Sequence, residues 1–160
     1  MLDRSPVNRR RVARLGMTAL LWATAVTAQS TTGLIQAVKT GRPDAVRALL
    51  DHGADPNSPQ GDGATALHHA AHRNDLEAAR LLTEAGADVT AANELGATPL
   101  WLAARNGSAA MVSHLLEAGA DANAPLTMGE TPLMTAARAG DLDTVRLLLA
   151  HGADVEATER

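Results

Sequence analysis

Residues 96–128 read GATPLWLAARNGSAAMVSHLLEAGADANAPLTM, and the chain restarts the same pattern at residue 129 with GETPLMTAARAGDLDTVRLLLAHGADVEA. An earlier copy, GATALHHAAHRNDLEAARLLTEAGADVTA, begins at residue 63. The Gly-Ala-Asp triplets of the chain start 33 residues apart, at Gly53, Gly86, Gly119 and Gly152. A fixed period of this size predicts a solenoid, in which one supersecondary unit is copied along an axis.

Each copy has the signals of two short helices joined by a tight turn. In the copy from residue 96, Thr98 takes the N-cap position and Pro99 the first helical position of a helix expected over residues 99–105. Asn106-Gly107 ends that helix, and a second helix is expected over about 108–118. The second helix carries an apolar stripe, which a single repeat cannot bury without a neighbour: Met111, Val112, Leu115 and Leu116.

The repeated pattern resembles the ankyrin repeat family. The opening G-x-T-P-L-H-x-A-A-x-x-G and the ending V-x-x-L-L-x-x-G-A-D-x-N-A are matched at Gly63, Gly96 and Gly129. A further copy over residues 34–57 lacks the Gly-x-Thr-Pro opening and resembles the N-terminal capping repeat of that family. The resemblance implies an all-α solenoid of about four 33-residue repeats with β-turn-like loops, covering residues 30–62, 63–95, 96–128 and 129–160.

Some positions depart from the family pattern. The histidine position holds His68, Trp101 and then Met134 in successive copies, and the resemblance implies that His68 forms hydrogen bonds between repeats. Thr83 replaces a leucine of the apolar stripe, and His114 stands where an apolar residue is usual. We expect these departures to weaken packing slightly without changing the fold.

The first 28 residues have the pattern of a signal peptide. A basic region ends at Arg14, an apolar run follows, and Val26-Thr27-Ala28 fits a small-x-small cleavage site before Gln29. The apolar run is shorter than the roughly 20 residues of a membrane span. The sequence therefore predicts export to a bacterial periplasm and a mature repeat domain over residues 29–160. An uncleaved membrane anchor and an ordinary helix that caps the repeats are the alternatives.

Composition excludes several classes of site. The chain has no Cys, so it can form neither a disulfide nor a thiolate metal site. Five of its 14 Lys and Arg residues precede residue 29, and the remaining part carries 17 of the 18 Asp and Glu residues. This acidic body is a poor candidate for binding nucleic acid, and nothing in the sequence indicates a cofactor.

The residue patterns argue against an enzyme. His68 and His72 share a helical face, as in some metal sites, but the Glu of an H-E-x-x-H motif is missing. A metal-binding protein centred on these two residues is thus the weaker alternative. One aspartate recurs at the same position of every copy, and we expect each to accept hydrogen bonds from backbone amides of its own turn: Asp55, Asp88, Asp121 and Asp154.

A protein partner is expected on the surface formed by the turns and the first helices, because solenoids bind through such extended surfaces. A basic row is predicted there, with one cation from each repeat: Lys39, Arg73, Arg105 and Arg138. Leu95, Leu126 and Met128 would add exposed apolar area at the turn tips. The other candidate contact residues are Asp62, Asn74, Glu94, Asn106, Thr127 and Glu130. A secreted factor that acts on host proteins is the alternative function.

The last repeat has no obviously polar cap, although terminal repeats normally have a polar outer face. Its second helix and following turn read TVRLLLAHG. Three explanations remain open at this point: Arg146, His151 and the charged tail are sufficient, this end docks onto another molecule, or the chain is shortened. We expect a monomer.

Overall fold

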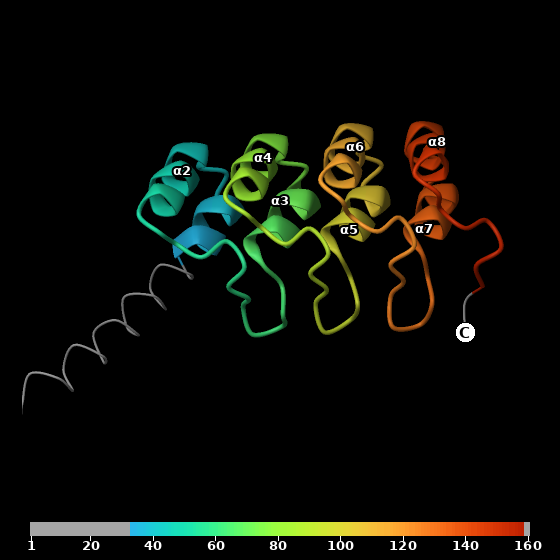
Figure 1. The fold of residues 1–160 in the computed structure, drawn as a ribbon, viewed down its shortest axis with the longest axis horizontal. Helices are drawn as coiled ribbons and strands as arrows, with labels where there is room; N and C mark the ends of the chain where they lie inside the picture. Colours follow the sequence, from blue (N-terminus) through green and yellow to red (C-terminus); the bar gives the residue numbers. More distant parts are fainter. Residues whose placement is uncertain (1–32, 159–160) are drawn as a thin grey trace, which may run out of the picture.

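The computed structural model describes residues 33–158, which form helices and turns without a strand. A helix over residues 33–39 is followed by α2 (Pro43–Asp51). Three helix pairs come next: α3 (Ala66–Arg73) and α4 (Leu76–Glu84), α5 (Pro99–Arg105) and α6 (Ala109–Glu117), and α7 (Pro132–Ala139) and α8 (Leu142–Ala150). The pairs stand side by side along one axis, with all the loops extending from the same edge (Figure 1). The predicted all-α solenoid is confirmed.

The helix ends follow from local chemistry. Thr98 Oγ1 accepts a hydrogen bond from the Trp101 amide at 3.2 Å, which satisfies one of the free N–H groups in the first turn of α5. The bounds of α5 are those expected from the sequence. Helix α6 is one residue shorter at each end than expected, because Ser108 and Ala118 are its N-cap and C-cap.

Small side chains bring neighbouring repeats together. Ala70, Ala103 and Ala136 occupy the same position of successive first helices and are completely buried. Helix α3 packs against α5, and α5 packs against α7, so these alanines set the spacing of the stack. Larger buried side chains of the second helices complete the core at one shared position: Leu82, Leu115 and Leu148.

The repeated aspartates serve their own turns, as predicted. Asp121 Oδ1 accepts a hydrogen bond from the Asn123 amide at 2.9 Å. Asp55, Asp88 and Asp154 each accept the equivalent bond from the residue two positions later. The side-chain and backbone hydrogen bonds from Thr90 lower the pKa of the Asp88 carboxyl. These carboxylates are therefore structural groups.

Two asparagines join one repeat to the next. Asn123 donates from Nδ2 to the Gly152 carbonyl at 3.0 Å and accepts at Oδ1 from the Asp154 amide at 2.7 Å. Asn57 makes the same two bonds to Gly86 and Asp88. We call this pair of bonds the asparagine bridge.

The junction between α3–α4 and α5–α6 is held differently. Thr90 stands at the bridge position there, and its hydroxyl donates to Asp88 within its own turn, at 2.7 Å. On the second helices, Thr83 Oγ1 and His114 Nε2 lie 3.1 Å apart and form a hydrogen bond. Thr83 and His114, the two polar residues in the apolar stripes, thus contact each other across this junction. Their hydrogen bond partly replaces the apolar packing that each residue lacks.

Neighbouring loops approach closely enough to require glycine. Gly96 has a φ of +78°, and a Cβ at this residue would lie 2.9 Å from the Thr127 amide nitrogen of the next loop. The Thr127 amide donates to the Leu95 carbonyl at 3.1 Å, so backbone groups link adjacent loops directly.

Thr90→Asn tests the asparagine bridge. We expect the new side chain to bond to the Gly119 carbonyl and the Asp121 amide and to raise the free energy of unfolding by about 1 kcal/mol, the usual net gain from such hydrogen bonds. Urea denaturation measures the change. The reverse substitution, Asn57→Thr, should lower stability by a similar amount, and an unchanged midpoint in both variants would contradict this role.

Candidate functional site

The row that repeats every 33 residues on the first helices has a histidine as its second member. Lys39, His72, Arg105 and Arg138 are spaced 33 residues apart, and a guanidinium nitrogen of Arg105 lies 3.0 Å from His72 Nδ1. The prediction that Arg73 belongs to the row is wrong by one residue, because His72 is the residue 33 positions from both Lys39 and Arg105. Arg73 follows His72 and is turned about 100° around α3, where its guanidinium lies beside Gly41 of the preceding repeat.

Neighbouring side chains hold the cations of the row in place. Lys39 Nζ donates to Gln60 Oε1 at 2.9 Å, and Arg138 forms a salt bridge with Glu130 at 2.8 Å. The side chain of Arg138 is nevertheless 64% exposed. A partner that meets this row therefore meets cations that neighbouring side chains hold in place.

Arg105, Glu130 and Arg138 come together around a pocket of about 350 Å³ between α5 and α7. Trp101 forms one side of the pocket, and the Arg105 guanidinium carbon lies 5.1 Å from the centroid of its ring, a cation–π contact. The tryptophan is half-buried. Its Nε1 atom is buried and has no hydrogen-bond partner among residues 33–158.

The residue equivalent to Trp101 in the preceding repeat shows what a histidine does at this position. His68 Nε2 donates to the Ala97 carbonyl at 3.0 Å, and His68 Nδ1 accepts from the Thr65 amide at 3.1 Å. The predicted hydrogen bond between repeats is confirmed. Both ring nitrogens of His68 are engaged, and His72 Nδ1 faces the Arg105 guanidinium. Within the described range, no group of three His, Asp or Glu residues could hold a metal ion.

Asn74 and Asn106 were expected at the partner surface, but their side chains connect repeats. Asn106 Nδ2 donates to the carbonyls of Ala71 at 3.2 Å and His72 at 2.7 Å. Asn74 Oδ1 accepts a hydrogen bond from Ser108 Oγ, and Asn74 itself ends α3 in the left-handed conformation. Both amides thus stabilise the junction between α3 and α5.

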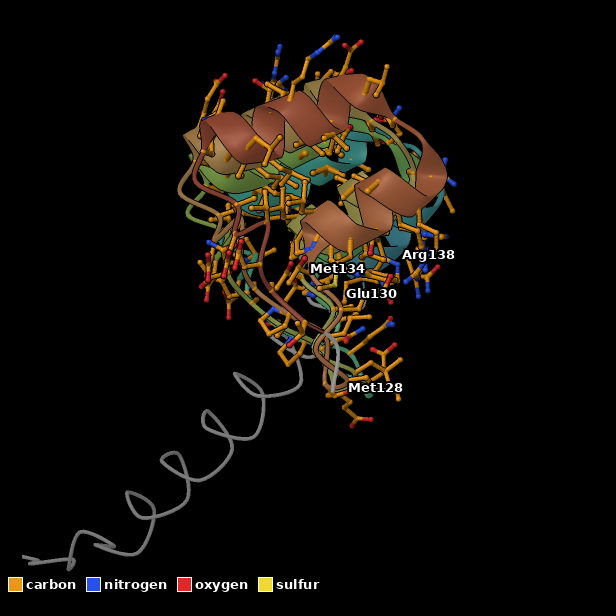
Figure 2. The ribbon with its side chains drawn as sticks, turned by 90° about the vertical axis from the view of Figure 1, so that its right-hand side faces the viewer. Met128, Glu130, Met134 and Arg138 are labelled. Atoms are coloured by element: carbon orange, nitrogen blue, oxygen red, sulfur yellow. The ribbon has the colours of Figure 1, made fainter. Side chains whose placement is uncertain are left out.

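The turn tips carry two strongly exposed apolar side chains, Leu95 at 68% and Met128 at 72%. Met128 lies at the tip of the loop before α7 (Figure 2). The expectation that Leu126 is exposed is wrong, since it is half-buried where its loop packs against Gly96 of the preceding one.

The polar candidates of the loops, Asp62, Glu94 and Thr127, are exposed. The Glu94 amide donates to the Asp62 carbonyl at 3.1 Å, so the first two loops are linked through their backbones. Hydrogen bonds from the Ala64 amide and from Gln60 lower the pKa of the Asp62 carboxyl. Asp62 is therefore an anion on the same surface as the basic row.

A larger pocket, of about 570 Å³, lies between the last two turns. Its polar lining is largely committed to structure, because Asn123 forms the asparagine bridge to Asp154 there. The pocket beside Trp101 offers an aromatic ring and two guanidinium groups, and we take it as the centre of the candidate site.

Two contributors to this pocket were missed from the sequence. Thr135 donates from Oγ1 to Glu130 Oε1 at 2.8 Å, and Ala139 completes the wall. The 33-residue spacing could have identified Thr135 as a residue of this surface. It occupies the same repeat position as His69, two repeats earlier. The same register identifies His72 as the member of the basic row.

A family model described as ankyrin repeats (3 copies) matches residues 4–93 and 89–159. The chain therefore belongs to the ankyrin repeat family. Members of this family are generally protein–protein interaction modules and are typically non-catalytic. No curated protein matches the chain.

The expected signal peptide, residues 1–28, lies outside the described residues, although the family match begins at residue 4. Between residues 33 and 158, no helix has both the length and the apolar character to span a membrane.

The burial of His68 and His69 predicts a pH-dependent stability. Burial, reinforced by the Lys39 charge, lowers the pKa of His69 to about 4, and burial also lowers the pKa of His68. Both pKa values are lower in the folded chain than in the unfolded chain, where histidine titrates near pH 6.5. The stability contributed by the neutral rings is therefore present above about pH 6.5 and is lost as pH falls toward 4.

Thermal unfolding of the wild type and of His69→Gln between pH 7 and pH 4 tests this expectation. Glutamine stands at the equivalent position of the first repeat, Gln36, so the substitution suits the fold. We expect Tm to fall less steeply with decreasing pH in the variant. Parallel curves over this range would contradict a role for His69.

Proposed function

We propose that this chain binds a protein partner through the surface formed by its loops and first helices, centred on the pocket beside Trp101. The observation that carries the proposal is the meeting of one half-buried tryptophan with two arginines and one glutamate between α5 and α7. Tryptophan and arginine are the side chains most enriched among the residues that dominate binding energy at protein interfaces.

The chemistry of the pocket favours a carboxylate of the partner. Arginine binds a carboxylate through paired N–H donors, and an approaching carboxylate can share Arg138 with Glu130 or contact Arg105 above the Trp101 ring. Leu95 and Met128 add apolar contact area at the tips of two neighbouring loops. The expected partner surface is thus an acidic group flanked by apolar side chains.

The proposed location is the bacterial periplasm. The support is the residue pattern of 1–28, with a basic start, an apolar run and small residues before Gln29. Residues 29–160 then act as a free, non-catalytic binding domain in that compartment.

Charge reversal at the pocket tests the partner site. The bait is the full chain carrying a photo-crosslinking residue in place of Leu95, used in the native envelope fraction, where the recovered partner is quantified by mass spectrometry. We expect Arg105→Glu with Arg138→Glu to lower its recovery by about tenfold or more, as for interface residues that each contribute over 1 kcal/mol. Arg80→Glu on the exposed side of α4 is the control and should leave recovery unchanged. Equal recovery from all three baits would exclude the pocket.

The intact mass of the protein from native cells tests the location. We expect a chain that begins at Gln29 and is released with the periplasmic fraction. A mass that includes Met1, or recovery from the cytoplasm, would contradict export, whereas recovery from the culture medium would favour the secreted factor.

A further inference from the structure

Two side chains that join the repeats at one junction have no counterpart at the next. Between α3 and α5, the His68 ring donates to a backbone carbonyl of the following repeat at 3.0 Å, and Asn106 Nδ2 donates to the His72 carbonyl at 2.7 Å. The residues 33 positions later are Trp101 and Ala139. Neither repeats the bond, because alanine has no side-chain donor and the tryptophan Nε1 atom has no partner in the described part of the chain.

These two positions form walls of the pocket between α5 and α7. Trp101 and Ala139 both line its volume of about 350 Å³. A side chain that extended from residue 139 as Asn106 extends from its own position would enter this space and meet the Arg105 carbonyl. The pocket is therefore the place that an amide group occupies one junction earlier.

The Arg105 carbonyl is the acceptor that a group in this space can reach. It is the repeat equivalent of the His72 carbonyl, which receives the shorter of the two bonds from Asn106. The longer bond goes to Ala71, whose equivalent, Ala104, is completely buried. Arg105 is the last residue of α5, and the last carbonyls of a helix favour hydrogen-bond donors because they lack partners within the helix and carry partial negative charge.

The charges around the pocket favour a neutral donor. Arg105, Arg138 and Glu130 line it, so its ionised groups sum to a positive charge that disfavours an ammonium group. The Glu130 carboxylate already accepts from Arg138 and from Thr135, each at 2.8 Å. A carboxylate has no N–H group to donate to the Arg105 carbonyl. A primary carboxamide has two such groups, and its oxygen can accept from a guanidinium.

We propose that this pocket takes the carboxamide of an asparagine or glutamine of the protein partner, which donates to the Arg105 carbonyl as Asn106 donates to that of His72. The inference rests on the proposed function, because it names a group of the partner bound at the same pocket. It adds a neutral anchor to the carboxylate expected at the arginines. The partner segment that fits therefore carries Asn or Gln beside Asp or Glu.

Capped amino acids test the pocket without a partner. The probes are the N-acetyl N-methylamides of asparagine, aspartate and lysine, each titrated into the 15N-labelled full chain. We expect saturable shifts of the Trp101 indole and Ala139 amide signals with the asparagine probe, and binding of the other two that is about fivefold weaker, the factor for one hydrogen bond. Tighter binding of the aspartate probe, or no saturable shift with any probe, would overturn the carboxamide site.

Ala139→Asn supplies the amide from the chain itself. The new side chain should bond to the Arg105 carbonyl, raise Tm by roughly 3 °C and remove the response to the asparagine probe. Ala139→Leu is the matched control, since it fills a similar volume without a donor and should not raise Tm. Equal Tm values for the two variants would contradict the bond on which the inference depends.

The crosslinking bait with Ala139→Asn separates the carboxamide site from the proposed function. We expect its recovery of the partner to fall by about tenfold, because the pocket is then filled. Undiminished recovery would show that the partner binds elsewhere and would contradict the proposed function, whereas the probe titrations and the Tm values decide the carboxamide site independently of any partner.

Discussion

The structure depends on the close approach of successive first helices, which alanine makes possible. Ala70, Ala103 and Ala136 are completely buried, and each stands where a larger side chain would push the repeats apart. At this spacing His68 reaches the Ala97 carbonyl, and the loops come near enough for the Leu95 carbonyl to accept from the Thr127 amide. The polar contacts between repeats are therefore consequences of a spacing that the alanine positions set.

The proposed binding surface and the junctions between repeats share residues. These residues cannot be substituted for a new partner without weakening a junction. Asn74 and Asn106 face the expected partner side but hold the junction between α3 and α5. The pocket beside Trp101 is different, because tryptophan has replaced the histidine that would bond across the junction. Its Nε1 atom is buried and finds no hydrogen-bond partner within residues 33–158. The hydrogen bond that His68 makes to the next repeat is therefore missing at Trp101, where the ring, the two arginines and the glutamate meet. That exchange makes this pocket the strongest candidate site on the surface.

The fold could be predicted because its signals are local and repeated. Thr98 and Pro99 begin α5 and Asn106 follows its last residue, so its bounds were available from the sequence, and the Asp121 position follows from turn chemistry alone. The site depends on contacts between repeats, which the sequence does not display. Strict 33-residue spacing selects His72 over Arg73 for the basic row, but the contact of His72 with Arg105 and the packing of Leu126 against Gly96 are visible only in the structure. The partnership of Thr83 with His114 likewise joins residues 31 positions apart.

The asparagine bridge reaches one repeat forward and no further. Asn57 and Asn123 each contact the turn of the adjacent unit, and the helix packing likewise joins immediate neighbours. A chain built in this way can gain or lose one whole 33-residue unit by recombination at the DNA level, and the junctions that remain keep their contacts. The number of repeats is therefore a property that evolution can change in single steps, and with it the length of surface that a partner meets.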